Sequence, residues 1–221
     1  MNLSHYISVF YNKYYPLTVY NRLRAQRRIK NKDFSLFCGD CMGGIISHQL
    51  GLPFLSPTVN MRIFQNDFYK LLLNLKEYLD SDEMVEVPNP NPGESCPTAM
   101  LKDILLTFTH FRTYEDGKKA WYRRCKKVNY DNLWIIATDY DGITEEDIAA
   151  LQTVPCRGLV VFTSKKLDYP YCFYMPQFEG QPHVGDLMQK TIWGKRYFEN
   201  YFDYVGWLNS DDPVVEHFRI R

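Results

Sequence analysis

A short apolar stretch that runs directly into a glycine-containing turn and a helix constrains the fold more than any other feature of this chain. Residues 34–37 are apolar and follow a charged stretch, which indicates a strand buried in a sheet. Gly43 and Gly44 then open a helix, and Gly51 ends it, because glycine is favoured just past the last helical residue. A strand that passes directly into a helix is typical of sheets covered by helices.

The same alternation of strand and helix continues as far as residue 162. Further strands are predicted at residues 84–87, 103–109, 133–138 and 158–162, and further helices begin near Asp67, Glu115 and Thr144. The alternation predicts an α/β fold with helices on both faces of the sheet. Ligands in such folds bind outside the carboxyl ends of the strands, so we expect the site in the loops at 38–44, 110–114 and 139–143.

The two ends of the chain differ from this central part. Residues 1–32 contain seven basic side chains and no acidic one, and they are predicted to form a basic helical extension. Residues 33–221 are predicted to form a single α/β domain with an aromatic C-terminal tail, helical near residues 193–204. The extension fits either a solvated helix or a contact with an anionic membrane surface, a membrane enzyme or an acidic partner.

The charge balance and the absence of long apolar stretches exclude several classes of protein. Lysine plus arginine equals aspartate plus glutamate, 26 each, which argues against a dedicated nucleic-acid-binding protein. The longest stretch without these charges, residues 41–61, contains Pro53 and Pro57, so no transmembrane segment is expected. With no secretory signal predicted either, we expect a cytoplasmic protein, at most peripheral to a membrane, with reduced cysteines.

The turn itself carries two candidate chemistries. Cys38 and Cys41 have the spacing of a redox pair, but that function requires them to face each other in an open cleft; the alternative is a cysteine packed under a tight turn. The other four cysteines lack the spacing of a second metal-binding pair. Backbone N–H groups at Gly43 and Gly44 could bind an anionic substrate group at the helix start, or the glycines could serve close packing alone.

Two carboxylates follow the predicted strand at 133–138. Asp139 and Asp141 lie one residue apart, and carboxylates at a strand end can hold Mn²⁺ or Mg²⁺ together with a nucleotide diphosphate. With Gly142 next in the chain, the same residues also fit a plain acidic turn. The sequence therefore names a divalent cation as the candidate cofactor without requiring it.

Basic and polar side chains follow or flank the other predicted elements. His110 ends the strand at 103–109 and is a candidate general base, with Arg112 as a phosphate or carboxylate clamp; the alternative is a hydrogen-bonded histidine at a sheet edge. Arg124 on the following helix is a further candidate for substrate binding. Asn129 and Asp131 fit turn chemistry or a ligand contact.

Several motifs occur in the order found in a known family. They are Ser35, Cys41-x-Gly43-Gly44, Ser56-Pro57, Asp67-Phe68, Asn74-Leu75, Tyr78-Leu79, Asp103-Ile104, His110, Trp121-x-Arg-Arg124, Asn129-x-Asp-Asn132 and Val161-Phe162. Over about residues 30–165 the chain resembles a bacterial family of unknown function whose members are often labelled exopolysaccharide biosynthesis proteins. The resemblance implies a three-layer α/β/α fold with a mixed, mostly parallel sheet. It supplies no catalytic residues, and because Cys38 lies outside its pattern, it directs attention to Cys41.

These observations lead to two hypotheses of different class. The first is a transferase of cell-surface polysaccharide assembly that acts on a nucleotide-activated or phosphorylated sugar. In it, Cys41 and His110 are catalytic, Arg112 binds phosphate, and Asp139 and Asp141 hold the metal, which requires their loops to meet at one edge of the sheet. The second is a non-catalytic accessory or scaffold domain that contacts a saccharide or a membrane enzyme through its basic helix and aromatic tail.

Overall fold

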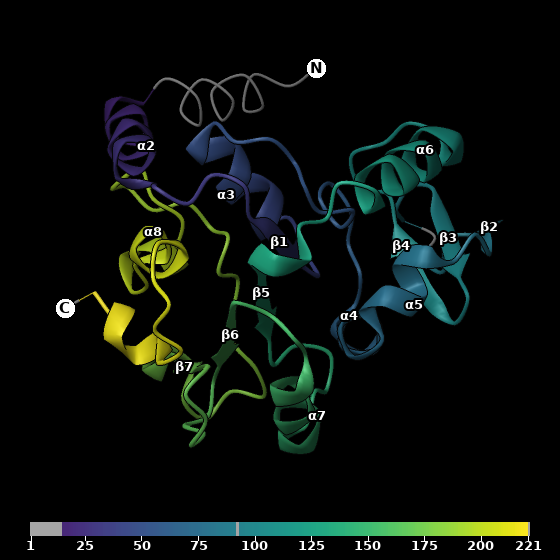
Figure 1. Cartoon of the computed structure of the whole chain (residues 1–221). Coiled ribbons are helices and arrows are strands. Elements are labelled where there is room, and N and C mark those ends of the chain that lie inside the picture. Colours follow the sequence, from purple (N-terminus) through teal and green to yellow (C-terminus); the bar gives the residue numbers. More distant parts are fainter. Residues whose placement is uncertain (1–14, 92, 221) are drawn as a thin grey trace.

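Two separate sheets form the framework of the computed structural model, which describes residues 15–91 and 93–220 (Figure 1). Four parallel strands lie in the order β1 (Ser35–Cys38), β5 (Leu133–Thr138), β6 (Gly158–Thr163) and β7 (Cys172–Tyr174). Three antiparallel strands, β2 (Met84–Val87), β3 (Thr98–Leu101) and β4 (Ile104–Thr107), form a second sheet beside the first. The predicted α/β class is confirmed, with the antiparallel strands in a sheet of their own.

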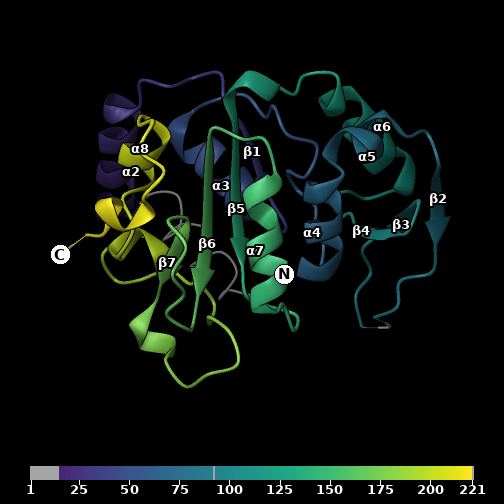
Figure 2. The same ribbon diagram turned by 60° about the horizontal axis from the view of Figure 1, so that its bottom comes forward.

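Helices cover both faces of the parallel sheet, and α5 and α6 lie beside the antiparallel sheet (Figure 1). The helices of the described residues are α2 (Pro16–Arg28), α3 (Met42–Leu50), α4 (Gln65–Leu73), α5 (Leu75–Asp80), α6 (Tyr114–Cys125), α7 (Glu145–Ala150) and α8 (Tyr204–Leu208). Side chains of α2, α3 and α8 share one core with Trp134, Ile136 and Val160, whereas α4 and α7 share the other with Ile135 and Val161. Figure 2 shows α3 and α7 on opposite sides of the strands. The result is a three-layer α/β/α arrangement.

Local signals located most of these elements, and the differences have physical causes. The helix predicted near Asp67 begins at Gln65 and is broken at Asn74, whose backbone leaves the helical region at φ −126° and ψ 37°. Strands β3 and β7 were not predicted. No helix spans 193–204: a 3₁₀ turn covers Phe198–Asn200, and α8 begins at Tyr204.

The described part of the basic segment packs on the domain. Ala25 and Ile29 are buried in the core under α3 and α8, and the Gln26 amide donates to the Gln49 carbonyl at 2.9 Å. Residues 1–14 of the predicted extension lie outside the described residues. In the predicted aromatic tail, Tyr204 and Trp207 are buried, whereas the Trp193 side chain is exposed. No helix in residues 15–91 and 93–220 is long and apolar enough to cross a membrane.

Replacement of Gly158 by alanine is expected to destabilise the fold. A Cβ atom there would lie 2.3 Å from two ring carbons of Trp134, which is itself held edge-to-face against Trp207 with ring centroids 4.7 Å apart. Such overpacking costs about 1–3 kcal/mol of unfolding free energy. Urea unfolding of Gly158→Ala measures the loss, and Gly93→Ala is the control because no atom lies within 4 Å of its added Cβ. Equal stability of the two variants would contradict the packing described.

Candidate functional site

The neighbouring strands β1 and β5 send the chain to opposite faces of the parallel sheet. Helix α3 follows β1 and packs on one face through Met42 and Ile46, whereas α7 follows β5 and packs on the other through Ile148. Adjacent parallel strands that diverge in this way leave a crevice outside their carboxyl ends, which is where ligands bind in open α/β sheets. The topology therefore places a candidate site between the loops that follow Cys38 and Thr138.

A cleft of about 380 Å³ occupies this crevice. It is lined by residues 39–41 after β1, by Thr138, Tyr140 and Asp141 after β5, and by the segments 62–65 and 186–188. The segment 62–65 is tied to both strand-end loops, because the Ile63 N–H donates to the Gly39 carbonyl at 2.7 Å and the Gln65 N–H donates to Asp141 at 2.8 Å. The volume and the mixed polar and apolar lining suit a small-molecule ligand.

Cys41, which lines this cleft, contacts His110, which lines an adjacent groove. The Cys41 Sγ atom lies 3.5 Å from His110 Nε2, within hydrogen-bonding distance for sulfur. Cys41 is the N-cap residue of α3 and is partly buried, whereas His110 follows β4 and is exposed. A nucleophile and a base within hydrogen-bond reach are the signature of covalent catalysis. Two of the sequence candidates, 69 residues apart in the chain, are thus brought together.

Burial keeps the Cys41 thiol protonated in the resting site. Its pKa is raised by burial first and by the nearby Asp40 carboxylate second, and the Thr109 side chain and the guanidinium groups of Arg62 and Arg196 oppose that rise. Because the thiolate is the nucleophilic form, a raised pKa means that a base must take the proton during reaction. His110 is placed to do so.

The rate of alkylation of Cys41 by iodoacetamide is expected to rise with pH and to reach half its maximum above about 8.5, the usual cysteine pKa. The midpoint lies above the usual value because the Cys41 pKa is raised, so less thiolate is present at any given pH. Mass spectrometry of peptides alkylated at a series of pH values measures the profile for each cysteine. Cys156 is the internal reference, because burial raises its pKa to about 11. A midpoint for Cys41 below 8 would mean that the thiolate is stabilised instead.

Acidic side chains line the cleft beside this pair. Asp40 accepts a hydrogen bond from the Met42 N–H at 2.8 Å, and burial raises the pKa of its carboxyl group. Asp141 and Asp186 also line the cleft. Arg62, a cation of the same lining, is already paired with Glu94 at 2.6 Å. Carboxylates accept hydrogen bonds, so this half of the site favours a ligand rich in hydroxyl groups.

Basic side chains gather on the other side of His110. Arg112, Lys119 and Arg123 line a shallow groove of about 420 Å³ together with His110 and a single acid, Asp116. None of these three forms an ion pair with a described residue. Lys119 and Arg123 are four residues apart on α6, where like charges repel. The Cys41–His110 pair therefore lies on a boundary between an acidic cleft and a basic groove.

Arg124 has a different place from these three cations. It is buried, its Nη1 donates to the Val59 carbonyl at 2.6 Å, and its guanidinium lies near the rings of Phe54 and Phe111. Burial lowers its pKa. Arg124 thus anchors the segment between α3 and α4, and lies apart from the residues that line the cleft.

The two aspartates predicted as metal ligands are held apart by protein contacts. Asp139 is buried, and its carboxylate accepts hydrogen bonds from the Ser164 N–H, the Ser164 hydroxyl and the Val184 N–H at 2.7–2.8 Å. Asp141 is exposed at φ 59° and accepts from the Gln65 N–H. The described residues contain no group of three or more His, Cys, Asp or Glu side chains placed to hold a metal ion. Asp139 ties the end of β5 to two other segments.

The remaining candidates lie elsewhere or serve packing. Asn129 donates from its backbone to Ser35 Oγ at 2.8 Å, which places it and Asp131 at the amino ends of β1 and β5, opposite the cleft. A Cβ on Gly43 would lie 3.0 Å from the Cys38 sulfur, and one on Gly44 would lie 3.1 Å from Val59, so both glycines allow close packing. Both glycines are buried, as is Cys38.

Cys38 does not share the cleft with Cys41. Its side chain is 1 % exposed in the core beneath α3, and burial raises its pKa well above the usual value. Both cysteines are free thiols. The requirement of the redox hypothesis, two sulfurs facing each other in an open cleft, is therefore not met.

Several residues of the site had not been predicted from sequence. Lys119 and Arg123 could have been found, because their spacing puts two cations on one face of a predicted helix that follows Arg112. Arg62 and Asp186 carry no local signal, since each reaches the cleft from an irregular segment.

The fold and site define an α/β domain with a cysteine–histidine pair in the crevice at the carboxyl edge of its parallel sheet. The chain belongs to the family described as "Domain of unknown function (DUF1919)", whose profile matches residues 14–209. It is also 34% identical over 186 residues to an uncharacterized protein of Haemophilus influenzae, covering 83% of this chain and 88% of that protein. The predicted membership of a family of unknown function is thus confirmed, with a bacterial relative.

Proposed function

We propose that this protein is a transferase of cell-surface polysaccharide assembly that uses Cys41 as nucleophile and His110 as general base. The observation that carries the proposal is the 3.5 Å contact between these side chains in the crevice where α/β sheets bind ligands. The link to polysaccharides rests on the sequence resemblance. The predicted cytoplasmic location suits the chemistry, because a reducing compartment keeps Cys41 a free thiol.

The proposed reaction has two displacement steps. His110 takes the thiol proton while the Cys41 sulfur attacks the electrophilic centre of the transferred group. The bond from that centre to the leaving oxygen breaks, its electron pair stays on the oxygen, and His110 returns the proton there. The acceptor hydroxyl then loses its proton to His110, attacks the same centre and displaces the sulfur as thiolate. That thiolate takes back the proton, which regenerates the enzyme.

The distribution of charge supports a phosphorylated or nucleotide-activated sugar as donor. Hydroxyl groups of a sugar can donate to the carboxylates of Asp40, Asp141 and Asp186 in the cleft. A phosphate group fits the unpaired cations Arg112, Lys119 and Arg123 in the adjacent groove. The pair at the boundary would then meet the bond that joins sugar and phosphate.

A covalent adduct tests the proposal directly. Intact-protein mass spectrometry after incubation with a panel of nucleotide sugars and sugar phosphates should show wild-type protein heavier by the mass of the transferred group. Cys41→Ser should show no such adduct, and Cys156→Ser, which removes another partly buried thiol outside the cleft, should retain it. Adducts that persist in Cys41→Ser, or transfer activity that survives its replacement, would exclude Cys41 as the nucleophile.

A further inference from the structure

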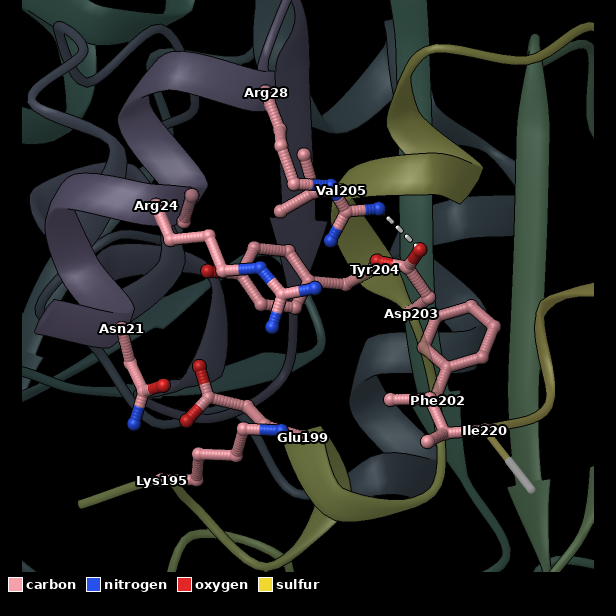
Figure 3. Close-up of a pocket in the computed structure, with 11 residues that line it drawn as sticks. Asn21, Arg24, Arg28, Lys195, Glu199, Phe202, Asp203, Tyr204, Val205 and Ile220 are labelled. Carbon is pink, nitrogen blue, oxygen red and sulfur yellow. Dashed lines mark hydrogen bonds and ion pairs between the residues drawn. The ribbon is translucent and has the colours of Figure 1, made fainter. Parts of the chain in front are cut away.

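A second pocket, which shares no lining residue with the cleft, lies between α2 and the chain from Lys195 to Val205 (Figure 3). Its volume is about 330 Å³. The walls come from segments distant in sequence: Asn21 to Arg28 on α2, residues 195–205, and Ile220 near the C-terminus. The proposed transferase chemistry makes no use of it.

One side of this pocket is closed by an ion pair. Arg28 at the end of α2 binds Asp203, the contact drawn as a dashed line in Figure 3. Asp203 also caps α8 by accepting from the Gly206 N–H at 3.2 Å. The position of α2 against α8 is thereby set by the protein itself, so the pocket exists without a ligand.

Two further cations line the pocket without a close ion pair to a described residue. Arg24 extends from α2 across the pocket, and Lys195 enters from the opposite wall (Figure 3). Neither forms an ion pair with any residue in 15–91 or 93–220. Glu199 also lines the pocket and is only 8% exposed. Its carboxylate accepts a hydrogen bond from the Arg196 N–H. The pocket thus holds an acid that is bound to the backbone; burial raises the pKa of that acid, and the charge of Lys195 opposes the rise. Arg24 and Lys195 both keep N–H groups that no described carboxylate binds in an ion pair.

The surrounding surface adds positive charge and an apolar wall. Helix α2 carries four arginines and no acidic side chain, so the potential around it attracts anions. Phe202, Val205 and Ile220 supply the apolar part of the lining. A ligand for this pocket therefore combines an anionic group for Arg24 and Lys195 with a short carbon skeleton.

We propose that this pocket binds a small phosphate monoester. Guanidinium binds two phosphate oxygens at once, and an ammonium on the opposite wall can take the third. The volume lies at the lower end of ligand pockets, which suits a phosphate on a few carbons. The phosphate can belong to a free metabolite or to a lipid headgroup, because both present the same group.

Calorimetric titration of the full chain with glycerol 3-phosphate tests this site, with glycerol as the neutral control. Saturable binding is expected, weakened about tenfold or more in Arg24→Ala and in Lys195→Ala. Arg24→Lys keeps the charge but loses the paired hydrogen bonds, so it should fall between wild type and Arg24→Ala. Arg27→Ala removes the same charge from an exposed position of α2 outside the pocket and should bind as wild type does.

A second arm separates the two sources of phosphate. Sedimentation with phosphatidylcholine vesicles that contain phosphatidic acid, lost in Arg24→Ala and retained in Arg27→Ala, would identify a lipid headgroup. Binding of glycerol 3-phosphate without sedimentation would identify a free ester. Equal weakening in Arg24→Ala and Arg27→Ala, or no saturable binding of either probe, would overturn the proposal. Cys41→Ala should leave this binding unchanged, so the result stands apart from the transferase proposal.

Discussion

Replacing Asp139 with alanine is expected to lower the free energy of unfolding by about 3–5 kcal/mol. The carboxylate is buried and accepts three hydrogen bonds, two of them from backbone N–H groups of Ser164 and Val184. Removal leaves both N–H groups buried without a partner, and each such group costs about 1–3 kcal/mol. Because domains have an unfolding free energy of about 5–15 kcal/mol, the variant should lose a large fraction of its stability. Urea unfolding followed by circular dichroism measures the change.

The matched control is Asp141→Ala, two residues away. Asp141 is exposed and makes a single side-chain hydrogen bond to a backbone N–H, so a much smaller loss is expected. The comparison also separates a structural aspartate from a metal ligand. If the two aspartates bound a metal ion, Mn²⁺ or Mg²⁺ would raise the melting temperature of wild type. Neither variant would show that rise. A stable Asp139→Ala protein would contradict the structural function argued from its contacts.

Replacing His110 with alanine is expected to lower kcat/KM of the transfer reaction by about 10²–10⁴-fold, the usual range for a general base. Cys41 is protonated in the resting site because burial raises its pKa, so without His110 the attacking thiolate forms rarely. The two residues act as a unit. The kcat/KM of the Cys41→Ala, His110→Ala double variant should therefore be no lower than that of the less active single variant.

His48→Ala provides the control for this second prediction. His48 is an exposed histidine in the last turn of α3, the helix that Cys41 caps, and it does not line the cleft. Its replacement should leave kcat/KM unchanged. Additive losses in the double variant would mean that Cys41 and His110 act in separate steps, and full activity of His110→Ala would remove it from the mechanism.

The elements that sequence predicted well are those whose signals are local. β5 matches its predicted bounds because five consecutive apolar residues and Thr138 are all buried. α3 ends where Gly51 takes the left-handed conformation at φ 69°. α7 begins at a complete capping box between Thr144 and Asp147. Each signal acts within a few residues, so no knowledge of distant segments was needed.

The candidate site could be predicted only in part for the same reason. The rule for parallel sheets placed the loops after β1 and β5 together, and His110 and Cys41 were named on residue type and position. Their pairing depends on how the antiparallel sheet packs beside the parallel one, which no local pattern encodes. Asp139 looked like a ligand because its partners, Ser164 and Val184, lie 25 and 45 residues away.

Sequence by itself determined the alternation of strands and helices, the glycine turn at 39–44 and the side chains able to do chemistry, because propensity and periodicity act over short distances. Only the tertiary structure decided which of those side chains meet. Cys38 packs in the core and Cys41 lines the cleft, whereas Asp139 and Arg124 hold neighbouring segments in place. Arg112, Lys119 and Arg123 form no ion pair within the described part of the chain. The physical reason is that burial and hydrogen bonding depend on packing between distant segments, and these determine whether a polar group is available to a ligand.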